Sequence, residues 1–568
     1  MLPPINAGAG SSPNIIPANV ISKTTKKKVN SGRWLYWATL SILLFCSSLQ
    51  AANPGEEGAE SVAKYGIKIP DPAPSRGDDE GGGPYEQLRI ENVMLVDGLG
   101  SPPRGPVDIN IVGDKIVSIR ASRGSLSALS NAVSDGIRRI DAAGMTAMPG
   151  FIDAHSHIGT PGQGLAGPVT PPEYVFKLWL AHGITTVREV GSGMGLAWTV
   201  DHARRSEEGK IVAPRIIPYS MFPGRQIVGD KAARKWVRAV KKKGAQGVKL
   251  RGGTREALVA VYDEAKKLGI GTASHHDQNG VYHVNALDSA RAGLDSMEHW
   301  YGLPEALFTD RTIQHYPPEY NYADEQWRFA EAGRLWLQAA EPGSQHWQEV
   351  MAEMLALDFT LVPTFTIYEA NRDVIRARDA EWHASYTLPA LQKFFMPDPR
   401  LHGSYHFDWT TADEVAWGNN FKRWMQFVNE YKNGGGRVAA GSDAGFIFKL
   451  FGFAYIRELE LLQEAGFHPL EVIQAATLNG AELIGMEEQI GSITPGKQAD
   501  IVLVQGNPVA NFKLLYGTGH MKLDRESGVL GRVGGVSYTI KSGIVYNAKA
   551  LLADVANMVA QAKLDEKS

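Results

Sequence analysis

Cysteine is almost absent from this sequence, which restricts both the covalent and the metal chemistry of the chain. The 568 residues contain one cysteine, Cys46, and it lies inside an apolar run at residues 34–49. A chain cleaved after that run cannot form disulfides, so its stability must come from an apolar core. Any metal ion must then be bound by His, Asp, Glu or Lys side chains.

Long apolar runs and strong net charge are also missing. The run at 34–49 is shorter than the about 20 residues that a membrane-spanning helix needs, and a formal net charge of -3 argues against nucleic acid as a main partner. Five basic residues precede the run, and Ala51 and Ala52 follow it. This is the order of a secretory signal, so we expect a signal peptide at 1–52 and an exported, periplasmic protein without a membrane segment. The alternative is an uncleaved anchor at 34–49.

Changes in composition divide the rest of the chain. Residues 53–84 are rich in Gly, Pro and charge, which predicts a flexible linker. Residues 85–148 consist of short β-rich runs separated by Asp-Gly and Gly-Asp turns, and residues 488–547 return to the same pattern. We predict that these two segments form one small composite β-sandwich domain from both chain ends. Residues 548–568 are predicted to form an amphipathic helical tail.

Between the two β segments, residues 149–487 alternate helical patterns with short apolar strands. PPEYVFKLWLAHG precedes ITTVREV, and DKAARKWVRAVKKKG precedes GVKL. The alternation predicts an α/β fold, a (β/α)₈ TIM-type barrel inserted in the β domain. Residues 301–431 interrupt it with aromatic-rich insertions that hold seven of the 13 tryptophans. These aromatic side chains either pack as core or cap the barrel mouth. In such barrels the catalytic residues lie at the mouth, at the C-terminal ends of the strands.

One stretch, MPGFIDAHSHIGT at 148–160, carries the first chemical signal. A short apolar strand ends there in His155 and His157. Residues two apart on a strand point to the same face. Both imidazoles can therefore reach one metal ion, and imidazole suits zinc and its neighbours.

Other predicted strands end in polar side chains of the same kind, namely Lys249, His275, His299 and Asp443. Each has a simple structural explanation, for example that Asp443 caps the next helix. Together, at successive strand ends of a barrel, they favour a cage for two divalent ions. Burial beside two cations should lower the pKa of Lys249, and a neutral amine can take up carbon dioxide to become an anionic carbamate. His276 follows His275 directly and points to the opposite face.

The motifs PGFIDAHSH, GITTVREV, GVKLRGG, SMEHW, AAGSDAG, ATLNGAELIG and GSITPGKQADIVLV resemble the metal-dependent amidohydrolase superfamily. The sequence is most similar to the imidazolonepropionase-like and Xaa-Pro dipeptidase-like (prolidase-like) branch, over about residues 88–545. The resemblance implies a binuclear centre, usually of zinc. It assigns His155, His157 and Asp443 to one ion and His275 and His299 to the other, with N6-carboxylated Lys249 bridging both. It further implies a metal-bridging hydroxide as nucleophile and Asp443 as general acid and base.

These residues predict an exported hydrolase of an amide-type bond in a dipeptide or an N-acyl amino acid. The same centre would also serve cyclic amides, lactones or carbamates. A non-catalytic scaffold is disfavoured because all six ligand positions are filled, and Lys249 argues against the mononuclear deaminases of the superfamily. Arg251, His276 and Tyr301 neighbour the ligands and are candidate substrate contacts. We expect a small-molecule or dipeptide substrate as the main partner, and the sequence allows a homo-oligomer.

Overall fold

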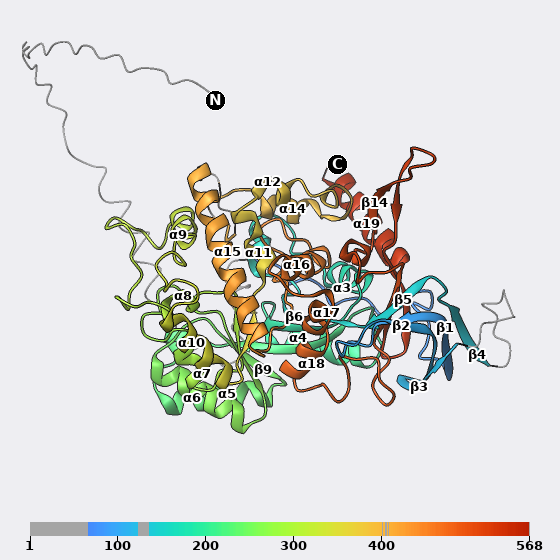
Figure 1. Ribbon diagram of the computed structural model, residues 1–568, viewed down its shortest axis with the longest axis horizontal. Helices are drawn as coiled ribbons and strands as arrows, with labels where there is room; N and C mark the ends of the chain where they lie inside the picture. The colour runs from blue at the N-terminus through green and yellow to red at the C-terminus, as the bar shows by residue number, and fades with distance from the viewer. Residues whose placement is uncertain (1–65, 123–135, 400, 404–405, 407, 567–568) are drawn as a thin grey trace, which may run out of the picture. The chain divides into compact units, whose positions relative to one another are not determined.

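A barrel of parallel strands forms the centre of the chain. The computed structural model describes residues 66–122, 136–399, 401–403, 406 and 408–566. Seven parallel strands pair in chain order into one sheet, which confirms the α/β barrel prediction (Figure 1). The strands are β6 (Phe151–Ser156), β7 (Ile184–Gly191), β8 (Arg215–Met221), β9 (Gly247–Leu250), β10 (Gly271–Ser274), β11 (Ser296–Glu298) and β12 (Thr360–Val362).

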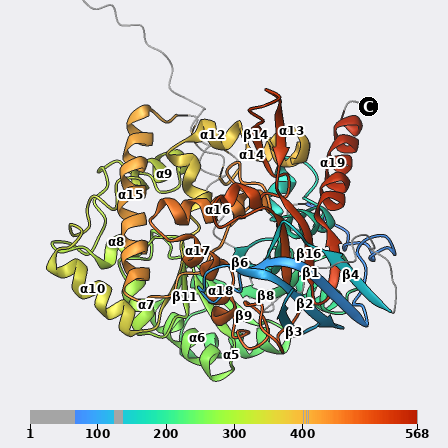
Figure 2. The same ribbon diagram turned by 45° about the vertical axis from the view of Figure 1, so that its right-hand side comes forward.

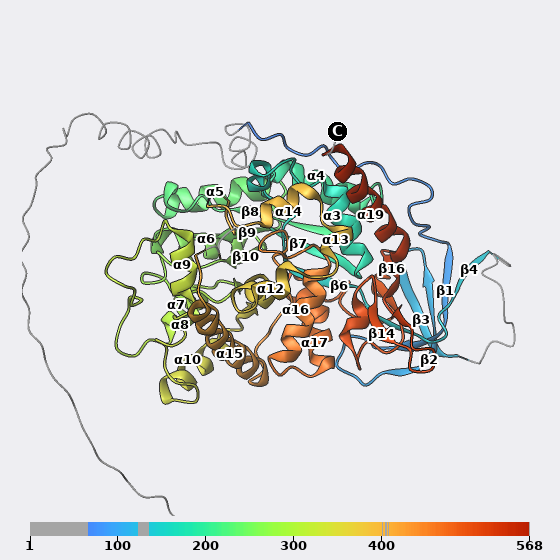
Figure 3. The ribbon, with the colours of Figure 1, turned by 90° about the horizontal axis from the view of Figure 1, so that it is seen from above.

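Helices carry the chain back between these strands and lie along their outer side (Figure 3). Helix α5 shows why they form, since its buried residues Ala233, Trp236, Val237 and Val240 repeat at helical spacing and face the barrel. The helices of this first part are α3 (Pro172–Ala181), α4 (Leu196–Glu207), α5 (Asp230–Lys242), α6 (Arg255–Lys267) and α7 (Ala286–Arg291). Short 3-10 turns η1 (Pro161–Leu165) and η2 (Gly224–Gln226) follow β6 and β8.

An irregular segment, residues 437–443, takes the eighth position of the barrel. On one side it bonds to β12, where Leu361 N donates to Arg437 O (3.0 Å) and Ala439 N donates to Leu361 O (3.0 Å). On the other side it bonds to β6, where Ala154 N donates to Ala440 O at 2.9 Å. The barrel therefore closes through seven regular strands and one segment that pairs as a strand only at Val438.

A second sheet combines strands from before and after the barrel, beside it in the view of Figure 2. Strand β5 pairs antiparallel with β13, with Ala147 opposite Leu503. Ile90, Ile109 and Ile501 are buried in the apolar core of this sheet. The composite β unit predicted from the two chain ends is thus one eight-stranded sheet. Its strands are β1 (Gln87–Leu95), β2 (Arg104–Val112), β3 (Lys115–Ala121), β4 (Ile137–Asp141), β5 (Met145–Pro149), β13 (Ile501–Gln505), β16 (Val536–Lys541) and β17 (Ile544–Asn547).

The aromatic-rich region 301–431 is mainly helical and surrounds β12. Of its seven tryptophans, four are almost fully buried, and they pack as core: Trp336, Trp347, Trp417 and Trp424. Long helix α15 begins with a capping box between Thr410 and Asp413. The elements are α8 (Leu303–Ala306), α9 (Glu325–Ala332), α10 (Gln345–Ala356), α11 (Phe365–Tyr368), η3 (Glu369–Asn371), α12 (Val374–Arg378), α13 (His383–Tyr386), α14 (Pro389–Phe395) and α15 (Thr411–Asn433).

The last helices complete the barrel and its outer surface. The C-terminal helix α19 packs against α3, where Lys177 Nζ lies 3.1 Å from Asp554 Oδ2. The remaining elements are α16 (Phe453–Glu464), α17 (Pro469–Ala476), α18 (Leu478–Leu483), η4 (Phe512–Leu515), α19 (Ala548–Asp565) and the hairpin β14 (His520–Leu523) and β15 (Leu530–Val533).

Part of the expected linker is attached to the barrel. Ala73 is buried, and its backbone N–H donates to His202 Nε2 at 3.1 Å, while Arg76 donates to Gly209 O at 3.0 Å. Ala73 and Arg76 therefore lie against α4 and the turn that follows it. The expected signal peptide at 1–52, with its apolar run 34–49, and linker residues 53–65 lie outside the described residues. Among the described residues, no helix is both long and apolar enough to span a bilayer.

Candidate metal centre

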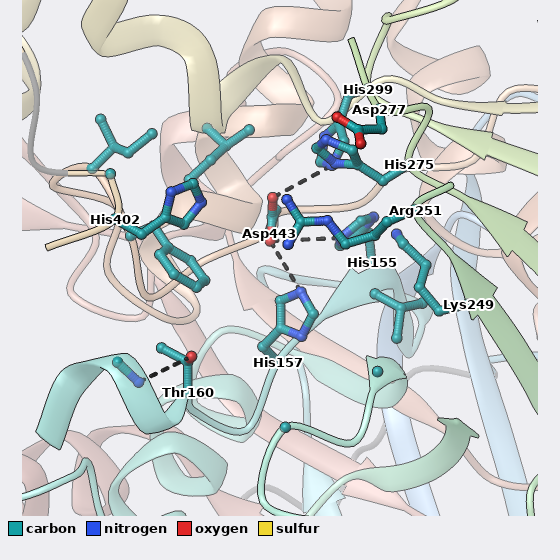
Figure 4. Close-up of a pocket in the computed structure, with 18 of the residues that line it drawn as sticks. His155, His157, Thr160, Lys249, Arg251, His275, Asp277, His299, His402 and Asp443 are labelled. Atoms are coloured by element: carbon teal, nitrogen blue, oxygen red, sulfur yellow. Dashed lines mark hydrogen bonds and ion pairs between the residues drawn. The ribbon is translucent and has the colours of Figure 1, made fainter. Parts of the chain in front are cut away.

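A cavity of about 270 Å³ opens at the C-terminal ends of the barrel strands, and the predicted ligands line it (Figure 4). Chain geometry explains their meeting, because each side chain lies at or near the end of a parallel strand or, for Asp443, at the end of the segment in the eighth position, and all such ends point to one face of a barrel. Seven strand-end or loop residues singled out from the sequence line the cavity together with Tyr301: His155, His157, Lys249, Arg251, His275, His299 and Asp443.

Asp443 is the centre of the group. One carboxylate oxygen, Oδ1, lies 3.5 Å from His155 Nε2 and 3.3 Å from His157 Nε2, and Oδ2 lies 3.7 Å from His299 Nε2. One ligand atom from each of His155, His157 and Asp443 falls within 4.8 Å of the others, a spacing that could hold a metal ion. Although burial opposes ionisation, the imidazoles of His155, His157 and His299 hold the pKa of Asp443 below its usual range.

The backbone at Asp443 aims its carboxylate inward. Its φ of +49° lies in the left-handed region, which Asp tolerates better than most residues. Its N–H donates to His155 O at 2.8 Å, so the segment 437–443 is bonded directly to the end of β6. The bonding of this segment to β6 therefore both closes the barrel and positions the Asp443 carboxylate.

Three of the four imidazoles, all but that of His157, are suited to act as neutral donors. Burial, together with neighbouring cationic groups, lowers the pKa of His275 and His299 well below the ordinary value, and burial lowers that of His155 to about 4. The rings of His275 and His299 lie 4.6 Å apart. For His157, burial is outweighed by hydrogen bonds to Asp443 and Glu189, which raise its pKa to about 9.

Lys249 is a buried amine in the same cage. Its side chain extends from β9, and its Nζ makes no hydrogen bond to any group in the described part of the chain. An unpaired buried ammonium is costly, and burial lowers the pKa of Lys249 to about 8. Four imidazoles, one carboxylate and one orphaned amine form a donor set that fits borderline divalent ions such as zinc, with the lysine as carbamate.

Buried acids that the sequence interpretation missed support the ligands. Glu298 is fully buried, accepts a hydrogen bond from His155 Nδ1 at 2.5 Å, and pairs with Arg188 Nη2 at 2.7 Å. Arg188 Nη1 also donates to Ser296 Oγ at 2.9 Å. A carboxylate behind an imidazole fixes which ring nitrogen faces the metal. The position of Glu298 directly before His299 in SMEHW was the available signal.

Asp153, two residues before His155 on β6, has a related role. It accepts hydrogen bonds from Ser442 Oγ (2.5 Å), Ser442 N (2.9 Å) and His155 N (3.2 Å). These bonds join the strand that carries His155 to the residue before Asp443. On the facing strand, His299 Nδ1 lies 2.6 Å from Thr364 Oγ1, which leaves the other ring nitrogen toward the cavity.

The three candidate substrate contacts have different surroundings. Arg251 and Tyr301 line the cavity, and the Tyr301 ring lies 5.8 Å from the His275 ring. His276 is absent from the lining; it is buried, with Nε2 2.8 Å from Ser289 Oγ. The expected alternation of faces accounts for this, because His275 faces the cavity and His276 faces α7.

The aromatic-rich region also contributes to the cavity. From the sequence, this capping of the barrel mouth was one of two alternatives, the other being packing as core. Tyr322, Arg328 and Phe329 reach it from α9 and the loop before it, and Phe394 reaches it from the end of α14. The arginine is held in place by Glu325, 2.7 Å away, and by the Tyr322 ring, whose centroid is 5.0 Å from its guanidinium carbon. The insertion thus packs as core and also forms the outer wall of the site.

Comparison with known proteins finds similarity to one family model and to proteins of known sequence. Residues 422–545 match the Amidohydrolase family. The chain is 32% identical over 165 residues to adenine deaminase 2 of Rhizobium etli, which covers 28% of this chain and 24% of that protein. The chain thus matches about a quarter of that relative's length.

Solved structures share the fold over a longer range. A Xaa-Pro dipeptidase with bound methionine aligns with a TM-score of 0.54 and 21% identity, covering 81% of this chain and all of that chain. Bottromycin amidohydrolase aligns with a TM-score of 0.57 and 17% identity, covering 90% of this chain and 95% of that chain. At these identities the likeness establishes a common fold.

Proposed function

We propose that this chain is a member of the amidohydrolase superfamily, which the match of residues 422–545 supports, and that it hydrolyses an amide-type bond in a dipeptide or an N-acyl amino acid. The observation that carries the proposal is the meeting of six side chains in one cavity: His155, His157, Lys249, His275, His299 and Asp443. In the overall reaction water adds across the C–N bond, so the carbonyl carbon gains a hydroxyl group and the leaving nitrogen gains a proton.

The donor set divides into two groups in our proposal. His155, His157 and Asp443 would hold one divalent ion, which their mutual spacing supports. His275 and His299 would hold the second, and Lys249, carboxylated on Nζ, would contact both. When bound, two such ions would acidify a water molecule and polarise the scissile carbonyl.

The proton transfers are assigned to Asp443. Its depressed pKa keeps the carboxylate ionised near neutral pH, which a general base requires. It would accept the proton of the attacking water and deliver it to the departing amine. Arg251 and Tyr301, from the same cavity, are proposed to contact the substrate.

A library screen tests this function. Protein stripped of metal by a chelator and protein reloaded with zinc in the presence of bicarbonate would be compared on dipeptides and N-acyl amino acids, with amine release as the readout. We expect about two zinc ions per chain and turnover only after reloading. Lactones and cyclic amides would be added with substrate loss as the readout, and hydrolysis confined to them would assign the protein to that substrate class instead. Equal turnover by stripped protein, or zinc-loaded protein without any turnover, would reject the proposal.

Export is a separate proposal that rests on residues 1–52, outside the described part of the chain. We expect N-terminal sequencing of protein from the soluble periplasmic fraction to begin at Asn53, because the basic and apolar regions before it have the order of a cleaved signal. Recovery from the membrane fraction with residues 34–49 still attached would indicate an anchor instead.

A further inference from the structure

Two side chains of opposite charge face the cavity from adjacent barrel strands. Arg251 follows β9 and Asp277 follows β10, and both belong to the cavity lining beside the candidate ligands (Figure 4). The two do not form an ion pair with each other. Within the described residues, the Arg251 guanidinium has neither an ion pair nor a hydrogen bond, and the residue is exposed.

The Asp277 carboxylate is held but not neutralised. Its Oδ1 accepts a hydrogen bond from Tyr322 Oη at 2.5 Å, and no cation of the described chain pairs with it. Tyr322 comes from the aromatic-rich region, so the insertion positions this acid. A carboxylate accepts several hydrogen bonds, and the phenol occupies only part of that capacity.

The other charges near the mouth are already compensated. Arg328 pairs with Glu325 at 2.7 Å, and Glu325 also lies 2.6 Å from His402 Nδ1. Their pairing leaves Arg251 as the available cation and Asp277 as the available anion among the described residues that line the cavity outside the candidate metal ligands. Asp277 is half-buried and Arg251 is exposed, and each can still make charge-assisted hydrogen bonds to a ligand with the matching charge.

We propose that this pair selects a zwitterionic substrate, a short peptide whose free α-carboxylate binds Arg251 and whose free α-ammonium binds Asp277. The inference rests on the proposed function and narrows it from dipeptides or N-acyl amino acids to dipeptides with both ends unblocked. Arginine is suited to the carboxylate because its planar guanidinium can donate two parallel hydrogen bonds. A cavity of about 270 Å³ is small for a ligand site and suits a ligand of this length.

The test compares one dipeptide in three forms: with free ends, with an acetylated amine, and with an amidated carboxylate. The compound would be the dipeptide cleaved fastest in the library screen, or Leu-Phe if none is cleaved. For the wild-type protein we expect kcat/KM to fall on the order of 10- to 100-fold with either end blocked, the loss typical of one charge-assisted hydrogen bond. Arg251→Gln should remove the penalty for the amide alone, and Asp277→Asn the penalty for the acetyl group alone.

Matched variants and a binding measurement keep the outcomes distinct. Arg255→Gln and Asp310→Asn remove the same charges at side chains 65% and 64% exposed, and both should keep the wild-type preferences. Equal cleavage of the acetylated and free dipeptides by wild-type protein would overturn the assignment of Asp277. If no form is cleaved and the screen also found no N-acyl amino acid substrate, the proposed function fails. Calorimetric titration of the three forms into zinc-loaded protein still decides the inference: equal affinities reject it, and weaker binding of both blocked forms supports it.

Discussion

Turnover by the Asp443→Asn variant is expected to fall by about 10²- to 10⁴-fold, the range that general acid–base catalysis contributes. The amide is nearly isosteric with the carboxylate but cannot accept the proton of the attacking water. It also removes the negative charge that lies 3.3 to 3.7 Å from the nearest nitrogens of His157, His155 and His299. The measurement is kcat on the substrate found in the screen, with zinc content determined on the same samples.

The fold should survive this change, because the backbone N–H of residue 443 still donates to His155 O. Asp310→Asn, an acid on an exposed loop, serves as the control and should behave as wild type. If the Asp443→Asn protein retains wild-type kcat, Asp443 has no part in proton transfer. If it loses zinc as well as activity, the carboxylate is required for metal binding, and the loss of zinc is enough to account for the loss of activity.

Glu298→Ala is expected to give the largest loss of stability, about 3–5 kcal/mol in the free energy of unfolding. Glu298 and Arg188 are both fully buried, and removing the acid leaves the guanidinium as an uncompensated charge. His155 Nδ1 also loses its acceptor, so zinc affinity should fall about 10- to 100-fold. Urea unfolding of the metal-stripped protein and competition for zinc with a chelator measure the two effects separately.

A double variant separates stability from ligand orientation. In Arg188→Met with Glu298→Leu, both charges and the acceptor for His155 Nδ1 are gone, so much of the lost stability should return while zinc affinity stays low. Glu208→Ala removes an acid from an exposed ion pair with Arg204 and should change little. Unfolding of Glu298→Ala at the wild-type urea concentration would show that the buried pair is not needed for the fold.

The candidate ligands other than Asp443 could be predicted from the sequence because each lies at or directly after the end of a short apolar strand, and a barrel brings such ends together. Lys249 and His299 occupy the expected strand ends, and the expected direction of His276 away from His275 agrees with its contact to Ser289. For these residues the local sequence pattern and the fold class are sufficient for the prediction, because the alternation of side chains along a strand determines which face of the sheet each one occupies.

Other features depend on contacts between residues far apart in the chain. Glu298 and Arg188 are 110 positions apart, and neither has a local pattern that predicts a buried pair. The segment 437–443 lacks the continuous pairing of a regular strand, so periodicity could not place it as the eighth member of the barrel. The composition of residues 66–84 predicts a linker, whereas the contact of Ala73 with His202 depends on a surface formed elsewhere in the fold.

The composite sheet has a consequence for the order in which the protein can fold. Strand β5 ends at Pro149, and its partner β13 begins at Ile501, so a ribosome must synthesise the whole barrel before these edges can pair. Until then the apolar faces of Ile90 and Ile109 lack Ile501 and Leu503, and β5 presents an open edge to other chains. Pairings across such sequence separations form slowly. A nascent chain whose synthesis stops within the barrel is therefore more prone to aggregate than the complete protein. A chaperone that covers β1 and β5 would protect the surfaces that are most exposed at that stage.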